Sequence, residues 1–327
     1  MNPFLKQVAD HYFKEGNIQR RCFIFPNRRS MLFFRKYLCE NVADSRENPI
    51  LAPQMLTIND LFLKASGARV ADRVRLLIDL YASYRELNPA AETLDEFIFW
   101  GDMMLGDFND VDKYLVDPVQ LFRNVSDYKE MQDDFSHLTP VQKAAINAFI
   151  KHFKDEAGRL TVHLDTDDPD VKGKFLQIWN IMLPLYEKFN ALLDAKGLAY
   201  EGKVYRHLAY QLKNHPAEDI FAAVFPRVEK FVFVGLNALN EAEKTVLRKL
   251  RDASMAEFCW DWSGDMIRDP QNRSSFFMSD NVKEFPQAFS LDAEGLPLPH
   301  FRVVSVASSV GQAKRLPDII GQIADMQ

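Results

Sequence analysis

The sequence predicts an α/β fold, in which a mostly parallel sheet is covered by helices and interrupted by a large all-helical insertion. Short apolar runs that suit strands alternate with amphipathic helical patterns near both ends of the chain, and such alternation builds parallel sheets. Between these two regions, residues 65–218 show helical periodicity. The low glycine content, 13 among 327 residues, also favours helices and short turns over a β-sandwich.

The first α/β piece extends to about residue 64. After an amphipathic N-terminal helix, the expected elements are a strand over residues 22–25, a helix over 28–42 and a strand over 54–56. Asn27, in the turn between the first strand and its helix, can cap that helix. Thr57 or Asn59 can cap the helix that follows the second strand.

The middle of the chain is expected to be helical. Predicted helices cover residues 70–86, 94–105 and 174–195, and a further helix opens at Thr139-Pro140. Pro140 would occupy the first helical position, which proline favours, whereas Pro184 is expected to interrupt the last of these helices. The polar stretch over residues 165–174 is expected to be an exposed loop.

A second α/β piece begins near Lys230. Its first strand, residues 231–234, is a continuous apolar run, as in strands buried on both faces. Asn240 caps the following helix, and Glu243 occupies the capping-box position. The remaining expected elements are a helix over residues 241–251, a strand over 256–260, a linker or exposed loop over 263–299, a strand over 303–309 and a helix over 311–326.

Composition excludes several classes of protein. A hydrophobic content of 47% indicates a folded chain, and no apolar run approaches the roughly 18 residues of a membrane span. Cys22, Cys39 and Cys259 lie far apart without metal-ligand spacing, which is typical of a reducing, cytoplasmic compartment. The histidines form no zinc-type pair. Neither a metal nor a cofactor is therefore expected.

One short segment is basic although the chain carries a net charge of −6. Between Gly16 and Cys39 the basic residues, with no acidic one among them, are Arg20, Arg21, Arg28, Arg29, Arg35 and Lys36. The turn at Asn27 would lie at the carboxyl end of a parallel strand and at a helix N-terminus, both of which favour anions. Two interpretations stay open: a phosphate or nucleic-acid contact at Asn27, Arg28 and Arg29, or a solvated helix face.

The sequence provides no complete nucleotide-hydrolysis site. Residues 197–204 nearly match the phosphate loop, but Val204 replaces the hydroxyl that would hold Mg²⁺. Because this stretch follows a helix and not a strand, Gly197 is better interpreted as a helix C-cap. The strand over 231–234 ends in Gly235-Leu236-Asn237, without the acidic pair that positions Mg²⁺ and water. This chain is therefore not expected to be an enzyme by itself.

Two other motifs have more ordinary interpretations. The acidic stretch Asp107–Asp112 lacks the glycine and distal Glu of a calcium loop, so helix capping or a solvated turn is favoured over a metal site. The two tryptophans of segment 259–263 could form a stacking platform for bases. A core or sheet-edge role is favoured, because tryptophan usually buries most of its surface.

The chain resembles AddB-type (RexB-type) subunits, and more specifically their Bacteroidetes-type relatives. These helicase-like, PD-(D/E)XK nuclease-bearing subunits act in bacterial double-strand-break resection. The matching segments, in the same order, are IFPNRRSMLFFRKYL at residues 24–38 and the stretches 52–62, 107–117, 197–206, 231–250 and 303–313. The resemblance therefore covers nearly the whole chain.

The resemblance implies a superfamily I helicase core. The first motor-like α/β domain would be discontinuous, and the implied divisions are residues 1–64 with 219–265, a helical insertion over 65–218, a linker over 266–299 and the start of a second α/β domain over 300–327. The missing nucleotide motifs make this an inactivated motor. The family's nuclease domain and iron–sulfur cysteines lie toward the C-terminus and have no match here, so the chain is expected to be the N-terminal part of a longer PD-(D/E)XK exonuclease subunit.

The implied function is a non-catalytic scaffold of a DNA-end-processing nuclease in recombination and repair, holding single-stranded DNA by its backbone. The partners would be single-stranded DNA or DNA ends and an AddA-type helicase-nuclease subunit. By position in the family, Asn27, Arg28 and Arg29 contact the backbone, Arg35 extends the basic surface, and Thr57 offers a phosphate contact. Two alternatives are a protein–protein interaction module that docks through its helical insertion, and an α/β enzyme that binds a phosphorylated substrate at the same loop.

Overall fold

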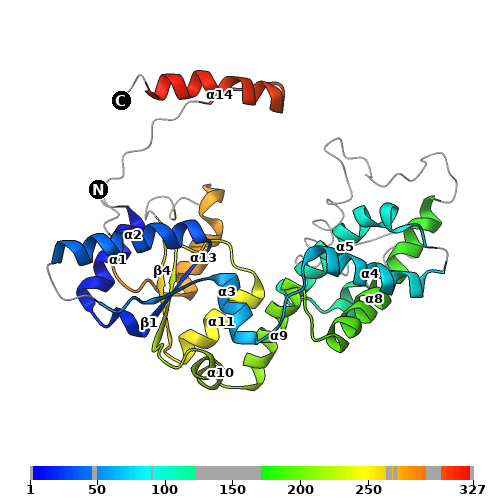
Figure 1. Cartoon of the computed structure of the whole chain (residues 1–327), viewed down its shortest axis with the longest axis horizontal. Helices are drawn as coiled ribbons and strands as arrows, with labels where there is room; N and C mark the ends of the chain where they lie inside the picture. The colour runs from blue at the N-terminus through cyan, green and yellow to red at the C-terminus, as the bar shows by residue number, and fades with distance from the viewer. Residues whose placement is uncertain are drawn as a thin grey trace. The chain divides into compact units, whose positions relative to one another are not determined.

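Figure 1 shows the computed structural model, which describes residues 3–45, 50–89, 91–122, 171–262, 267, 271–291 and 303–324, the side chains of 171–180, 323 and 324 excepted. The chain divides into two units. Residues 2–291 form the larger unit, which contains the sheet, and residues 292–327 belong to the smaller one.

A four-stranded, all-parallel sheet confirms the predicted α/β fold. Its strands are β1 (Arg21–Phe25), β2 (Gln54–Thr57), β3 (Lys230–Val234) and β4 (Ala256–Cys259). Their order across the sheet is β2-β1-β3-β4, and Cys22 of β1 pairs with Gln54 on one side and Phe231 on the other. Each of the four strands lies within one residue of the range expected from the sequence.

Each face of the sheet has its own apolar core, because successive side chains of a strand point to opposite faces. On one face, Phe23 and Val232 pack with α1 (Phe4–Glu15) and α2 (Arg28–Ser45). On the other, Ile24 and Phe233 pack with helices that come later in the chain. Those helices are α3 (Ile58–Ser66), α10 (Ala217–Val224) and α11 (Glu241–Asp252), and Figure 1 shows the two helical layers.

A helical region is inserted between β2 and β3. Its helices include α4 (Arg73–Leu87), α5 (Leu94–Lys113), α8 (Val171–Ala195) and α9 (Glu201–Asn214). Leu80, Phe108 and Phe189 belong to a third apolar core built by α4, α5 and α8. Helix α9 joins this region to the sheet, because Tyr205 and Leu208 lie in the core beneath the sheet while α9 also packs on α5.

Helix α8 differs from its prediction at two places. It continues through Pro184 without interruption. Proline costs a helix a hydrogen bond, about 3 kcal/mol, but Leu185, Phe189 and Leu193 on this helix are fully buried, and their packing outweighs that cost. The helix also begins at Val171, so the loop predicted over 165–174 is wrong from that residue onward. The helix predicted at Thr139-Pro140 lies outside the described residues.

The predicted linker over 263–299 contains a helix. Its described part includes a short 3₁₀ turn, η3 (Arg273–Ser275), and α13 (Phe276–Glu284). The segment then covers the edge of the sheet, where Phe285 is fully buried and Gln287 forms a bridge to Phe258 of β4. A few apolar residues therefore anchor this segment to the sheet. The prediction of a linker relied on the polar composition of the stretch and so missed α13.

The smaller unit is described at residues 303–324, where α14 (Ser309–Ala324) confirms a predicted helix. The strand expected over 303–309 is wrong, since residues 303–306 form no strand. Val303 is 86% exposed, and an isolated strand has no neighbour to satisfy its backbone. Among the described residues, no helix is long and apolar enough to span a membrane.

Candidate nucleic-acid interface

The carboxyl ends of all four strands meet at one edge of the sheet, because the strands are parallel. From β1 the chain crosses to β2 on one side and then to β3 on the other side of β1. The direction of strand order therefore reverses between β1 and β3, and open parallel sheets bind ligands beyond the strands at such a point. The loops at this point are Pro26-Asn27 after β1 and Gly235 after β3.

Asn27 begins helix α2, as predicted. Its side-chain oxygen accepts hydrogen bonds from the backbone N–H of Ser30 at 3.0 Å and from the Ser30 hydroxyl at 3.3 Å. The first N–H groups of a helix have no partner within it and carry the positive end of the dipole. The amides of Arg28 and Arg29 thus lie at an anion-attracting helix end, at the switch point of the sheet.

Three arginines of α2 are exposed and without an acidic partner. Within the described part of the chain, Arg28, Arg29 and Arg35 form no ion pair. Lys36 is paired only with Glu40 on the same helix, at 3.8 Å, and both side chains are exposed. Exposed ion pairs of this kind contribute little. This surface therefore presents fixed positive charge that the fold itself does not neutralise.

The other two basic residues of the segment have structural partners. Arg20 pairs with Glu229. The Arg21 guanidinium, only 11% exposed, pairs with Glu15 at 2.6 Å, donates to the Gly16 carbonyl and lies over the Tyr12 ring. Both arginines precede or begin β1, at the opposite end of the strand from Asn27. The predicted run of six basic residues is thus two separate features at opposite ends of β1, and only the part on α2 lies beside Asn27.

Thr57 caps α3, as predicted, but its hydroxyl is occupied. The hydroxyl donates to the Asp60 carboxylate at 2.7 Å and accepts from the Asp60 N–H at 3.2 Å. The same carboxylate accepts from the Thr57 N–H. This capping box places a negative charge at the helix N-terminus, which opposes a phosphate there. Thr57 is therefore a weaker site residue than the arginines.

The loop after β3 is closely packed. Gly235 has a φ of +66°, and a Cβ at this position would lie 3.2 Å from the Phe4 ring at the start of α1. The carbonyl of Asn237 accepts a hydrogen bond from the buried Asn281 of α13. Residues 235–237 carry no carboxylate, so this loop places no acidic side chain at the edge of the sheet.

Residues 197–204, which nearly match a phosphate loop, form the junction between α8 and α9. Gly197 has a φ of +61°, its N–H donates to Asp194, and the N–H of Leu198 reaches back to Leu193 at 2.9 Å. This is the predicted helix C-cap. Gly202 lies inside α9, and its N–H donates to the Asn109 side chain of α5 at 2.7 Å.

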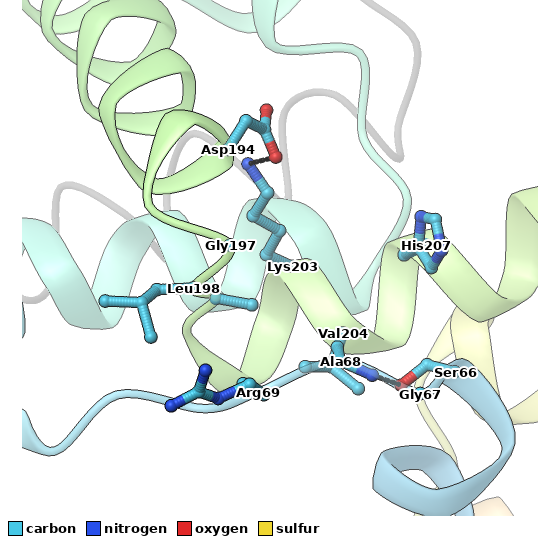
Figure 2. Close-up of a pocket in the computed structure, with 11 residues that line it drawn as sticks. Ser66, Gly67, Ala68, Arg69, Asp194, Gly197, Leu198, Lys203, Val204 and His207 are labelled. Atoms are coloured by element: carbon cyan, nitrogen blue, oxygen red, sulfur yellow. Dashed lines mark hydrogen bonds and ion pairs between the residues drawn. The ribbon is translucent and has the colours of Figure 1, made fainter.

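A cavity of about 260 Å³ lies at this junction (Figure 2). It is bounded by the end of α3 at Gly67, by Arg69, and by the first two turns of α9 with Lys203 and His207. Lys203 is paired with Asp194 at 2.9 Å and donates to the Asn190 carbonyl at 3.0 Å, both in the last two turns of α8. The lysine thus holds the helix end, and no residue of the Asn27 loop lines this cavity.

The acidic stretch Asp107–Asp112 is neither a cap nor a solvated turn, because it lies inside α5. Asp112 is fully buried and accepts from Tyr186, Tyr200 and Arg206, each at 2.5 Å. Burial, with the nearby charge of Asp110, raises the pKa of Asp107 to about 7. In the described ranges, no group of three or more metal-ligating side chains could hold an ion.

The favoured core role of the tryptophan segment is confirmed for Trp260. It is fully buried, stacks on Phe258, and donates its indole N–H to the Phe285 carbonyl at 2.8 Å. The exposed apolar residues near the arginines are instead Leu32 and Phe33 on α2. The sequence predicted an amphipathic helix there without showing that these two side chains lie outside the core.

Comparison with known proteins provides no family assignment, since no family model and no curated protein matches the chain.

Proposed function

We propose that this chain is a non-catalytic, helicase-like scaffold that holds single-stranded DNA by its backbone, at the N-terminal end of α2. The observation that carries the proposal is a set of exposed arginines on α2 that form no ion pair with a described residue. Arg28 and Arg29 lie at the helix N-terminus beside the sheet's switch point, and Arg35 lies about two turns further along the same helix. Forked guanidinium donors and helix-terminal amides suit phosphate oxygens. Asn27 orients this helix end through its cap.

The same edge of the sheet lacks the groups that nucleotide hydrolysis requires. The loop after β1 contains no glycine, and residues 235–237 after β3 contain no carboxylate. A scaffold role therefore fits this edge better than a motor role. The order of segments that resemble AddB-type subunits supports a place in DNA-end processing, with an AddA-type helicase-nuclease as the partner that supplies movement. The three free cysteines support a cytoplasmic location.

The test is single-stranded DNA binding by the full chain across a salt series, measured by fluorescence anisotropy with labelled oligo-dT. For Arg28→Ala/Arg29→Ala we expect weaker binding and a salt slope shallower by about 1.4, since each phosphate contact to a single strand contributes about 0.7. Arg69→Ala/Arg227→Ala is the matched control. Those two side chains are also exposed, and neither forms an ion pair with a described residue.

An unchanged slope in Arg28→Ala/Arg29→Ala would place the contact elsewhere. No binding by the wild-type chain at low salt would favour the protein-interaction alternative. The helical region offers apolar side chains for that role, with Val74 and Ile78 on α4 66% and 47% exposed. They are one turn apart and so lie on one face of the helix.

A further inference from the structure

Two apolar side chains lie exposed among the basic residues of α2. Leu32 is 53% and Phe33 44% exposed. On a helix, residues three or four positions apart are neighbours. Leu32 is therefore surrounded by Arg28, Arg29, Arg35 and Lys36, and Phe33 lies one turn from Arg29 and Lys36.

Helix α2 does not use Phe33 to pack against the sheet. The same helix fills its core positions with Phe34, fully buried, and with Leu38. Phe33 belongs to neither apolar core of the sheet, and no aromatic ring of the described residues stacks on it. An exposed phenyl ring costs free energy in water, so a ligand that covers it would gain from this contact.

The combination of an aromatic ring with arginines distinguishes single-stranded from duplex nucleic acid. Phosphate contacts alone attract duplex and single strand alike, because both carry the same backbone. An aromatic ring beside cations is the combination that holds unpaired bases, which stack on the ring while arginines contact the backbone. Phe33 is four residues from Arg29, about 6 Å along the helix axis and on the same face, so both contacts fall within a short stretch of one strand.

Resting on the proposed function, we infer that Phe33 stacks on an unpaired base and that the α2 surface is thereby specific for single-stranded nucleic acid. The occupant follows from charge complementarity: four cations and no acid lie between Arg28 and Cys39. The buried Trp260 cannot take this role, since its ring is enclosed by the core.

The experiment compares two labelled probes of equal length, oligo-dT and the corresponding abasic strand, with the full chain. Phe33→Leu keeps an apolar side chain of similar size on a surface position, so the fold is expected to survive. We expect it to weaken binding of oligo-dT about tenfold and to leave binding of the abasic strand and the salt slope unchanged. Phe33→Trp should keep or strengthen the binding of oligo-dT. Phe99→Leu, at a 61% exposed position of α5, is the matched control.

The possible outcomes separate the stacking role of Phe33 from the backbone contact of the arginines. If Phe33→Leu binds oligo-dT as tightly as the wild type while Arg28→Ala/Arg29→Ala loses affinity, the stacking role is wrong and the backbone site stands. Equal losses on both probes would also exclude stacking, because the abasic strand has no base to lose. If the wild-type chain binds neither probe, both proposals fail.

Discussion

At the scale of single residues, the buried cluster around Asp112 is where we expect one substitution to lower the free energy of unfolding strongly. Its carboxylate, from α5, receives hydrogen bonds from Tyr186 of α8, from Tyr200 and from Arg206 of α9. Arg206 also donates to the carbonyls of Val111 and Val116. A buried charge of this kind is tolerated because both carboxylate oxygens accept hydrogen bonds and one of their donors is a guanidinium. The cluster therefore ties three parts of the helical region together.

We expect Asp112→Ala to lower the free energy of unfolding by about 3–5 kcal/mol, because it leaves the Arg206 charge and two tyrosine hydroxyls without their partner. Asp110→Ala on the same helix is the control. That side chain is exposed, and its loss should change stability by less than about 0.5 kcal/mol. Urea denaturation followed by circular dichroism measures both. Similar midpoints for the two variants would show that the cluster contributes no net stability.

At the scale of elements, the contact between α9 and α5 depends on a glycine. A Cβ at Gly202 would lie 2.5 Å from the backbone oxygen of Asn109 and 2.7 Å from its Cα. Neither group is a flexible side-chain end, so any larger residue must push the two helices apart. Sequence reasoning noticed Gly202 only as part of an incomplete phosphate loop, because nothing in one sequence shows which helix will lie against it.

Gly202→Ala should therefore destabilise the protein by about 1–3 kcal/mol, the usual cost of overpacking. For Gly106→Ala in α5 we expect a change in stability of the opposite sign, because a Cβ there meets no atom within 4 Å. It should stabilise the protein by up to about 1 kcal/mol through better helix propensity. Thermal unfolding of the two variants checks the pair. A Gly202→Ala protein as stable as the wild type would mean that α9 can shift on α5 without loss.

At the scale of the whole molecule, the sequence predicted the sheet well and the site only in part. The two central strands, β1 and β3, could be located because continuous apolar runs reflect burial on both faces, as Phe231–Val234 shows. The helix in the predicted linker was missed because its anchors, among them Phe285, are few and separated by polar residues. The pairing of Arg21 could not be predicted either, since Glu15 and Tyr12 come into contact with Arg21 only in the folded chain.

The sheet and the helical region should unfold together, because α9 contributes to both. Its Leu208 and Leu212 lie in the core beneath the sheet, while Arg206 is bonded to the buried Asp112 of α5. Residues 2–291 also form one compact unit. We therefore expect amides of β1 and β3 to exchange with solvent at the same free energy of opening as those of the inner turns of α5, measured by native-state hydrogen exchange in a urea series.

Comparing Asp112→Ala with the wild type tests how far the coupling between the sheet and the helical region depends on the bond between Arg206 and Asp112. Without the carboxylate, Arg206 keeps only its hydrogen bonds to the carbonyls of Val111 and Val116. The contact between α9 and α5 is then weaker, so exchange from α5 should become faster than exchange from β1 and β3. If α5 already exchanges faster than the strands in the wild type, the helical region is an independent folding unit and α9 does not couple it to the sheet. Equal exchange in both proteins would instead assign the coupling to the apolar packing of α9, with Asp112 stabilising both parts alike.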